Sequence, residues 1–378
     1  MIFLDNASTT KISKEALDVY INESQNNFYN PSALYLPGAS ISQRITQEKQ
    51  KILKILNANK FDNIVFTSGA TESNNMVINS FVTPRKKALF GITEHPSVYN
   101  VAKKLLDQGY NIEFINVNTN GVIDIEDFRN KLTDDVNFVS IMHINNETGA
   151  INPIKELVHI VKTKNKSIIF HVDGVQAFGK VDVDIDDLGV DLYTISSHKI
   201  MGPKGIGLLY IKKGINIKPL IIGGGQEHDL RSGTENTPAI FAFGKACELI
   251  EEYRQKYECN IRNLCEYTKL ELKKVNSDLL IFSDNNCSPF VISFALRNLR
   301  AETILRMLEQ RGVLIGNGSA CSSHKSGNRI LSNMNVGNEY IEGALRLSFN
   351  YFTTKEEIDE FINKLKEIVI EYKNKTSR

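Results

Sequence analysis

The sequence predicts an α/β protein built on a mainly parallel β-sheet with helices on both faces. Between residues 63 and 196, short apolar runs typical of strands alternate with longer runs that have helical periodicity. This alternation indicates βαβ units, which place successive strands parallel in one sheet. A chain of 378 residues is long for one core, so we expect two domains. We place the large domain at residues 13–256 and the small one at residues 257–378, with residues 1–12 added to it.

Composition excludes several classes of protein. The chain has 45 basic and 44 acidic residues, a formal charge of +1, which does not favour binding to nucleic acid or to a membrane surface. It has no apolar run of membrane-spanning length and no secretory signal at its start, so we expect a cytoplasmic protein. Its five cysteines are odd in number and form no Cys-x-x-Cys pair. We therefore expect neither a disulfide framework nor a metal site.

The N-terminal half shows its elements in order. Helical patterning over residues 11–60 is interrupted at Asn30-Pro31, a pair that requires an extended or turn conformation. The alternation then predicts strands at 63–67, 88–93, 112–117, 138–143 and 167–172, a short buried strand after Asp191, and helices at 72–81, 97–108, 124–132 and 153–164.

The C-terminal half is more polar. A long polar loop after Gly223 precedes the remaining elements. These are helices at 238–257, 301–309 and 355–373, charged helical residues through 274, strands at 279–282, 290–294 and near 345–349, and a loop rich in Gly, Ser and Asn from Gly316 to Asn328.

Polar motifs follow several of the predicted strands, where the ligands of parallel sheets bind. The first is Thr67-Ser-Gly-Ala70-Thr71-Glu72, a strand, a glycine turn and a helix start, which suits an anion such as a phosphate. The alternative is an ordinary capping turn with Thr71 as the N-cap. The motif lacks the Gly-x-Gly-x-x-Gly and P-loop patterns, so a nucleotide is not the expected ligand.

Two further strand ends carry ring and amide groups. His95, held by the following proline, is able to stack on an aromatic ring or carry protons, or it is an ordinary loop histidine. Asn146 offers an amide to a ring oxygen or a carboxylate, or it serves only in a turn.

Asp173 and Lys199 end two more strands. A carboxylate at the end of an apolar strand needs a cationic partner, either a pyridinium nitrogen or a neighbouring Lys or Arg. A lysine at such a place is desolvated, and its neutral amine can condense with an aldehyde. The alternative for Lys199 is a surface lysine at a strand exit.

Together these groups are the components of a pyridoxal 5′-phosphate site, and the chain resembles the class V aminotransferase-fold cysteine desulfurases of the NifS/IscS type. The matching segments are Leu4–Thr10, Phe66–Ser73, Thr93–His95, Ser140–Glu147, His171–Asp173, His198–Gly207, Arg231–Thr234, Gly318–Cys321 and Arg346–Ser348. The resemblance implies a type I pyridoxal phosphate-dependent transferase fold. This fold has a large domain with a mainly parallel seven-stranded sheet and a smaller α+β C-terminal domain that carries a mobile loop.

The resemblance also implies residue roles. Lys199 would hold the cofactor through its amine, Asp173 would hold the pyridine nitrogen protonated, Gln176 would bind the phenolic oxygen, and His95 would stack on the ring and pass protons. The phosphate contacts would come from Ala70, Thr71, Ser196 and His198, with Thr234 from a second subunit of a homodimer. The carboxylate of the substrate would be held by Asn30, Asn146 and Arg346, and Asn146 would also contact the cofactor.

By the same resemblance, Cys321 would take the sulfur of L-cysteine, leaving L-alanine and a persulfide for an acceptor protein. The acceptor would be an iron–sulfur cluster scaffold or a tRNA-thiolating enzyme. We expect the cysteines at 247, 259, 265 and 287 to be inert. The alternatives are a selenocysteine lyase, a class V aminotransferase or a non-catalytic scaffold.

The chain departs from the family pattern at a few positions. Ser197 stands where glycine is usual, Gly174-Val175 where Ala-Thr is common, and Asn317 where serine is common. The run from Cys321 to Arg346 is also short, which leaves the acceptor open.

Overall fold

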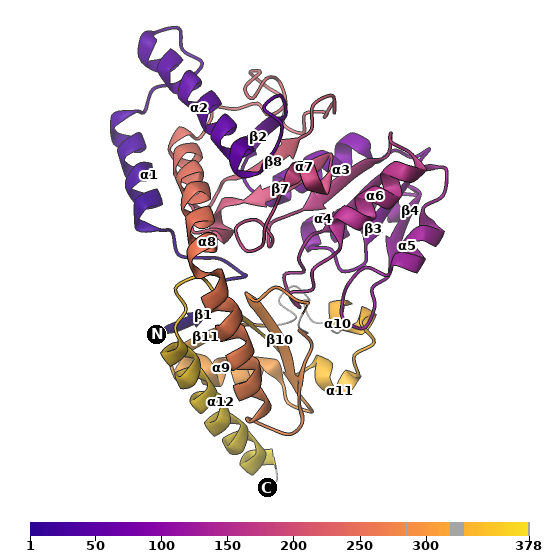
Figure 1. The fold of residues 1–378 in the computed structure, drawn as a ribbon, viewed down its shortest axis with the longest axis vertical. Coiled ribbons are helices and arrows are strands. Elements are labelled where there is room, and N and C mark those ends of the chain that lie inside the picture. The colour runs from indigo at the N-terminus through magenta and orange to yellow at the C-terminus, as the bar shows by residue number, and fades with distance from the viewer. Residues whose placement is uncertain (284–285, 318–328, 377–378) are drawn as a thin grey trace.

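The computed structural model describes residues 1–283, 286–317 and 329–376 and contains two β-sheets (Figure 1). The larger sheet lies in the upper part of Figure 1 and the smaller one in the lower part, with the long helix α8 (Thr237–Lys273) running beside both. The prediction of an α/β protein is confirmed.

The larger sheet has seven strands in the order β2-β8-β7-β6-β5-β3-β4. Their bounds are β2 (Asn63–Thr67), β3 (Lys87–Gly91), β4 (Ile112–Ile115), β5 (Val136–Met142), β6 (Ile169–Asp173), β7 (Leu192–Ser196) and β8 (Gly207–Ile211). Only β8 is antiparallel to its neighbours, β2 and β7. The sheet is therefore mainly parallel, as predicted.

Side chains that alternate along each strand face two separate layers of core. In β3, Phe90 packs with α3 (Ala70–Phe81) and α4 (Pro96–Asp107), whereas Leu89 joins the opposite layer. That layer includes apolar residues of α5 (Ile125–Lys131), α6 (Ile154–Lys164) and α7 (Ile185–Leu188). Both faces of the sheet are thus covered, which explains why its strands are continuous apolar runs.

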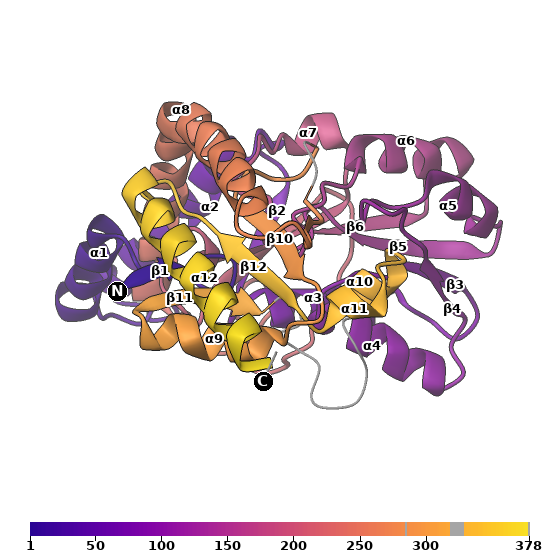
Figure 2. The same ribbon diagram turned by 90° about the horizontal axis from the view of Figure 1, so that it is seen from below.

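The smaller sheet has five strands in the order β1-β11-β12-β10-β9. Their bounds are β1 (Ile2–Leu4), β9 (Leu279–Ile281), β10 (Val291–Leu296), β11 (Val313–Asn317) and β12 (Ala344–Ser348). Apolar residues of these strands pack with the second half of α8, with α9 (Ala301–Gln310) and with α12 (Lys355–Thr376). Figure 2 shows α12 running across this sheet. The short helices α10 (Arg329–Asn333) and α11 (Asn338–Ile341) lie between β11 and β12 along the chain.

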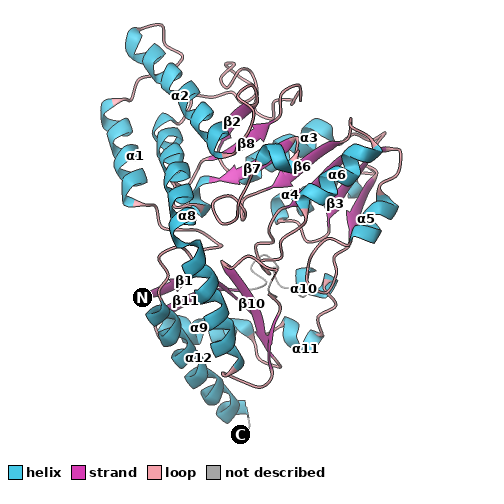
Figure 3. Ribbon diagram, in the orientation of Figure 1, coloured by secondary structure: helices cyan, strands magenta, loops and turns pink. Residues whose placement is uncertain are grey.

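Helices also join the two halves of the molecule. As predicted, the Asn30-Pro31 pair separates α1 (Lys14–Asn26) from α2 (Leu36–Ile55), and both helices contact α8. Figure 3 shows that α8 is unbroken along its length, so it continues past residue 256, where we placed the division of the chain.

The predicted start of one loop is wrong. The expected loop at Gly316–Asn328 begins too early, because Gly316 and Asn317 are the last residues of β11 and pair with β12. A glycine is required in this strand, since a Cβ at Gly316 would lie 2.5 Å from Asp5 Oδ1. Residues 318–328 lie outside the described residues. Among the described helices, none is long and apolar enough to span a membrane.

Candidate active site

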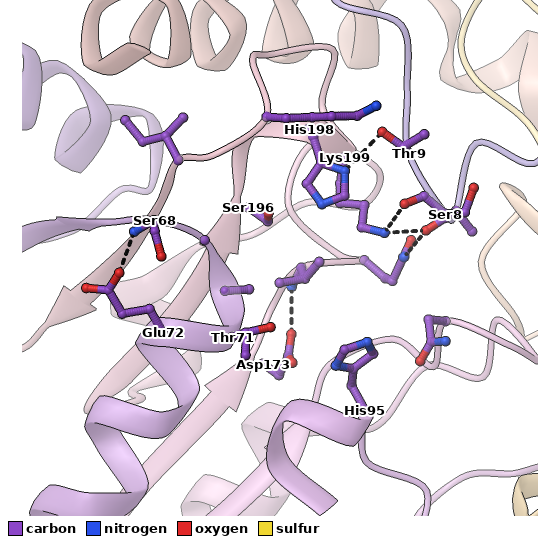
Figure 4. A pocket seen from close by; sticks show the side chains of 18 of the residues that line it. Ser8, Thr9, Ser68, Thr71, Glu72, His95, Asp173, Ser196, His198 and Lys199 are labelled. Carbon is purple, nitrogen blue, oxygen red and sulfur yellow. Dashed lines mark hydrogen bonds between the residues drawn. The ribbon is translucent and has the colours of Figure 1, made fainter. Parts of the chain in front are cut away.

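A cavity of about 630 Å³ lies at the carboxyl ends of the parallel strands in the larger sheet. Four of its lining residues follow or end strands of this sheet, namely His95, Met142, Asp173 and Ser196. The N-terminal segment Ala7–Thr9 and Arg346 of β12 complete the wall. Figure 4 shows Lys199 on one side of the cavity, with Asp173 and His95 on the other. Both sheets therefore contribute to one site.

Lys199 ends a 3₁₀ turn, Ser197–Lys199, that follows β7 directly. Its Nζ donates hydrogen bonds to the carbonyl oxygens of Ala7 and Ser8, at 2.7 and 2.6 Å (Figure 4). Burial and the nearby Arg346 together lower the pKa of Lys199 to about 8, against the opposing effect of the carboxylates of Asp5 and Asp173. A neutral, nucleophilic amine is therefore accessible near neutral pH.

Asp173 is the last residue of β6 and is buried. Its Oδ2 accepts a hydrogen bond from Asn74 Nδ2 at 2.9 Å, and its Oδ1 accepts one from the Val175 amide at 3.1 Å. Among the described residues it forms no salt bridge, so the structural ion pair that we considered is absent there. The carboxylate is thus available to a cationic ligand in the cavity.

The turn after β2 leads into α3, whose first residues line the cavity. The N-cap is Gly69, which has a φ of 154° and no side chain to cap the helix, so Thr71 lies in the first turn and is not the cap. The Ser68 amide is satisfied by Glu72 Oε2 at 2.8 Å, which leaves the amides of Ala70 and Thr71 at the mouth of the helix. Such a helix start, together with the cavity that it lines, suits an anion.

His198 stands close to this anion-binding region. Its Nδ1 is 3.1 Å from Thr9 Oγ1. Burial, together with the nearby cations Lys199 and Lys204, lowers the pKa of His198 to about 4. The ring is therefore neutral at physiological pH and contributes hydrogen bonding without a charge.

Arg346 closes the other end of the cavity. Its Nη2 pairs with Asp5 Oδ1 at 2.6 Å, and its Nη1 donates to the Asn146 carbonyl oxygen at 2.9 Å. The Nε atom of Arg346 and the Oδ1 atom of the neighbouring Asn146 are both buried, and neither has a hydrogen-bond partner among the described residues. A buried polar atom without a hydrogen-bond partner lowers the stability of the fold, unless a bound ligand supplies the partner.

Gln176 and Lys180 form a pair that the sequence analysis missed. Gln176 Nε2 donates to the Ala7 carbonyl oxygen at 2.9 Å, and Lys180 Nζ donates to Gln176 Oε1. Full burial, together with the nearby cations Lys199 and Arg346, lowers the pKa of Lys180 to about 7. The pair orients the Gln176 amide so that its NH₂ group faces the N-terminal segment.

Most of the predicted site residues meet in this cavity. Its lining includes Ala70, Thr71, His95, Asn146, Asp173, Gln176, Ser196, His198, Lys199 and Arg346. Two predicted residues lie elsewhere in the chain's own fold: Asn30 is exposed and accepts from the Ser32 amide, and Thr234 is exposed beside a separate pocket. Cys321 lies outside the described residues.

The four other cysteines differ in burial. Cys247, Cys265 and Cys287 are buried, and Cys259 is exposed. Burial raises the pKa of Cys247 well above its usual value and that of Cys265 to about 11. These two thiols stay protonated and therefore unreactive, as we expected.

Comparison with known proteins agrees with this geometry. Residues 2–361 match the family model described as aminotransferase class-V. The cysteine desulfurase IscS of Dictyoglomus turgidum is 38% identical over 374 residues, covering 97% of this chain and 94% of that protein. A solved NifS-like protein has a TM-score of 0.91 at 31% identity, over 97% of this chain and 99% of its own. The structure titled SspA in complex with cysteine has a TM-score of 0.80 at 28% identity, over 94% and 100%.

The fold and the cavity define an α/β protein with a lysine amine at its centre. The chain belongs to the class-V aminotransferase family, with the NifS/IscS-type cysteine desulfurases. Enzymes of this family depend on pyridoxal 5′-phosphate. The cavity fits this group, because it combines an amine whose pKa is lowered to about 8, a buried carboxylate and the start of a helix. Among the residues that the structure describes, the carboxylate has no cationic partner.

Proposed function

We propose that this protein is an L-cysteine desulfurase that uses pyridoxal 5′-phosphate. The observation that carries the proposal is the convergence of Lys199, Asp173 and Arg346 on one cavity. An amine for an aldehyde, a carboxylate for a ring nitrogen and a guanidinium for a substrate carboxylate are the three anchors that such a reaction needs. We also propose that a second subunit contributes Thr234 to the site and that Cys321 accepts the sulfur.

The residues around the cavity would hold the cofactor. Lys199 would bind its aldehyde carbon, Asp173 its ring nitrogen and Gln176 its phenolic oxygen, while His95 would stack on the ring. Its phosphate would be bound by Ala70, Thr71, Ser196 and His198. When bound, the cofactor supplies an electron sink that weakens bonds to the substrate's α and β carbons.

The chain's own groups would handle the substrate and its protons. Arg346 would bind the substrate carboxylate with Asn146, whose unpartnered Oδ1 and whose carbonyl contact with Arg346 place it next to the guanidinium. Lys199, with a pKa of about 8, can hold or release a proton at Nζ close to neutral pH. Asn30 would join the carboxylate site only through a rearrangement or from the partner subunit.

Cys321 would be the sulfur acceptor within the enzyme. Its thiolate would form a bond to the sulfur of cysteine while the bond from that sulfur to the β carbon breaks. The β carbon gains the electron pair and a proton to give L-alanine, and both sulfurs share the oxidation as a persulfide. The step balances without an external oxidant.

The activity is tested by incubating the purified protein with pyridoxal 5′-phosphate, L-cysteine and a thiol reductant. We expect a yellow protein and equal amounts of alanine and sulfide. Lys199→Ala should abolish turnover, and Cys321→Ser should abolish persulfide formation, whereas Cys259→Ser should leave both unchanged. Undiminished sulfur transfer by Cys321→Ser would refute the role of this cysteine. Preferential turnover of selenocysteine or of an amino acid and keto acid pair would identify one of the alternative reactions.

We also infer a homodimer with composite sites, in which Thr234 of one subunit contacts the cofactor phosphate of the other. In support, Thr234 is exposed in its own chain, and Leu34, Leu36 and Ile222 are 102%, 86% and 85% exposed, which is unusual for large apolar side chains. Coexpression of Lys199→Ala with Thr234→Ala chains should restore activity, because each mixed dimer regains one intact site. Failure to recover activity in isolated mixed dimers would contradict composite sites.

We further propose an acceptor protein for the sulfur and a cytoplasmic location for the enzyme. An iron–sulfur scaffold and a tRNA-thiolating enzyme both accept a persulfide sulfur, and the cytoplasm is where either would be met. Protein carrying radiolabelled sulfur on Cys321 should pass the label to one of the two in cell extract, and fractionation locates the enzyme. The Cys321→Ser protein is the control.

A further inference from the structure

A series of hydrogen bonds inside the protein links Asp173 and His95, which both lie on the cavity wall. Asp173 Oδ2 is 2.9 Å from Asn74 Nδ2, and the same nitrogen is 2.9 Å from Ser97 Oγ. Ser97 Oγ is in turn 2.8 Å from His95 Nδ1. Asn74 and Ser97 are both buried, and neither was singled out by the sequence. This series of hydrogen bonds therefore connects Asp173, the candidate partner of the cofactor ring nitrogen, with His95, whose ring is the candidate for stacking on the cofactor.

The direction of each bond follows from one contact. The Ser97 backbone amide donates to His95 Nδ1 at 3.2 Å, and an amide N–H can only donate. Nδ1 is therefore an acceptor without a proton, and the Ser97 hydroxyl must also donate to it. Since this hydroxyl has a single hydrogen, it accepts from Asn74, whose second N–H goes to Asp173. Each hydrogen in this series of hydrogen bonds is thereby assigned to a donor.

Local structure holds this arrangement in place. His95 is the N-cap of α4, so its Nδ1 caps the Ser97 amide, and Pro96 occupies the first turn of the helix. Asn74 comes from α3, which packs beside α4. Asn74 Oδ1 is buried and has no hydrogen-bond partner within the described part of the chain. Turning the amide over would place this oxygen against the Asp173 carboxylate, which cannot donate to it. The fold thus tolerates an unsatisfied oxygen and keeps both donors in position.

We propose that Asn74 and Ser97 are positioning residues that fix His95 as a neutral ring with its proton on Nε2, the nitrogen on the cavity side. Nε2 makes no hydrogen bond with any residue that the structure describes, and His95 lines the cavity. His95 therefore offers a hydrogen-bond donor to a ligand. The ring-nitrogen assignment stands independently of the proposed function, and only its kinetic consequence rests on that function.

Protonation of His95 to an imidazolium is opposed on two grounds. A proton on Nδ1 would face the Ser97 amide hydrogen, which cannot turn away. Burial also lowers the pKa of His95, and the cations Lys199 and Arg329 lower it further, although Asp173 opposes them. Lys199, whose pKa is lowered to about 8, is a group in the cavity that can accept a proton near neutral pH.

The direct test is ¹⁵N NMR of the full-length protein with ring-labelled histidine, with and without pyridoxal 5′-phosphate. His95 signals are assigned by their loss in His95→Gln. At neutral pH we expect Nδ1 at the chemical shift of an unprotonated nitrogen and Nε2 at that of a protonated one. A proton on Nδ1, or an imidazolium, overturns the proposal whether or not the protein turns over cysteine.

Variants test the positioning role. Ser97→Ala removes the hydroxyl that donates to Nδ1, and Asn74→Ala removes the donor that holds this hydroxyl in that orientation. Since the Ser97 backbone amide alone then opposes a proton on Nδ1, both variants should raise the population of the Nδ1–H form. They should also lower kcat about tenfold, with KM changed less than about twofold, because an acid–base contribution is weakened and substrate binding is not. Asn79→Ala is the matched control, because the side chain of this exposed asparagine of the same helix donates to the Asn75 carbonyl oxygen and, among the described residues, to no other group. An unchanged tautomer in folded Asn74→Ala protein would refute the role of Asn74.

Discussion

At the scale of single residues, the buried His171 shows that a chemically suggestive side chain can be structural. Its Nδ1 is 2.9 Å from Ser140 Oγ and its Nε2 is 3.0 Å from Thr194 Oγ1. Both nitrogens are occupied, and full burial lowers the pKa of His171 to about 3. The residue therefore stays neutral and supports the strands on either side of Asp173.

This burial predicts acid sensitivity. An unfolded histidine binds a proton below its usual pKa of 6.5, whereas folded His171 does so only near 3, so its contribution to stability is present above 6.5 and is lost as pH falls. From about pH 6 to about pH 4, the free energy of unfolding of the wild type should fall by about 2 kcal/mol more than that of His171→Phe. Urea unfolding at several pH values measures both slopes. Equal slopes would show that His171 does not drive the change.

A second residue-scale feature explains a departure from the family pattern. A Cβ at Gly174 would lie 1.9 Å from Cε1 of Tyr193, whose ring is buried and whose hydroxyl is 2.9 Å from His143 Nδ1. Tyr193 therefore occupies the space that an alanine at 174 would need.

Gly174→Ala should consequently destabilise the protein by about 1–3 kcal/mol through overpacking. The same substitution in a Tyr193→Leu background should cost less than about 0.5 kcal/mol, because the smaller side chain leaves room. A double-mutant cycle of denaturant unfolding measures this coupling. Additive losses would mean that the ring is not the obstacle.

At the scale of elements, the first strand shows how a short segment depends on the rest of the chain. In β1, Leu4 is fully buried in the core of the smaller sheet, and Phe3 on the opposite face is 38% exposed. The strand pairs in parallel with β11 and leads into the cavity segment Ala7–Thr9.

Leu4 and Phe3 should contribute very differently to the free energy of unfolding. Leu4→Ala should lower the free energy of unfolding by about 2–5 kcal/mol, because it leaves a cavity in the core. Phe3→Ala should change it by about 0.5 kcal/mol or less, since its side chain is exposed. Guanidinium unfolding curves of both variants test the contrast, and similar losses would contradict the assigned face of the strand.

Elements with local signals were predicted well, and those stabilised by distant partners were not. The apolar alternation located β2 at its observed bounds and the helices α3, α4, α5, α6 and α9 to within two residues. It missed β1, whose partner β11 lies some three hundred positions along the chain, and it missed β8, whose run follows a glycine-rich turn. A three-residue strand has no periodicity of its own, so only pairing defines it.

At the scale of the whole molecule, the site depends on two sheets at once. The larger sheet supplies Asp173 and Lys199, and the smaller one supplies Arg346, whose guanidinium pairs with Asp5 of the N-terminal segment. Binding in this cavity should therefore stabilise the whole fold.

We expect pyridoxal 5′-phosphate at about a hundred times its Kd to raise the free energy of unfolding by about 2.7 kcal/mol. Pyridoxal, which lacks the phosphate, should give a smaller rise at the same concentration, because it cannot use the amides at the start of α3. Thermal unfolding with each compound makes the comparison. Equal shifts would indicate that the phosphate is not bound there.

The sequence by itself determined the α/β class, the alternation of strands and helices from β2 to β7, and the residues at the strand ends, because apolar periodicity and turn residues are local properties. Only the tertiary structure decided what those residues touch. It placed Asp5 against Arg346 and Lys180 against Gln176, and it joined His95 to Asp173 through Asn74 and Ser97. These contacts depend on the packing of α3 against α4 and of the N-terminal segment between two sheets. No spacing along the chain encodes such packing, since it arises only when distant surfaces are buried together.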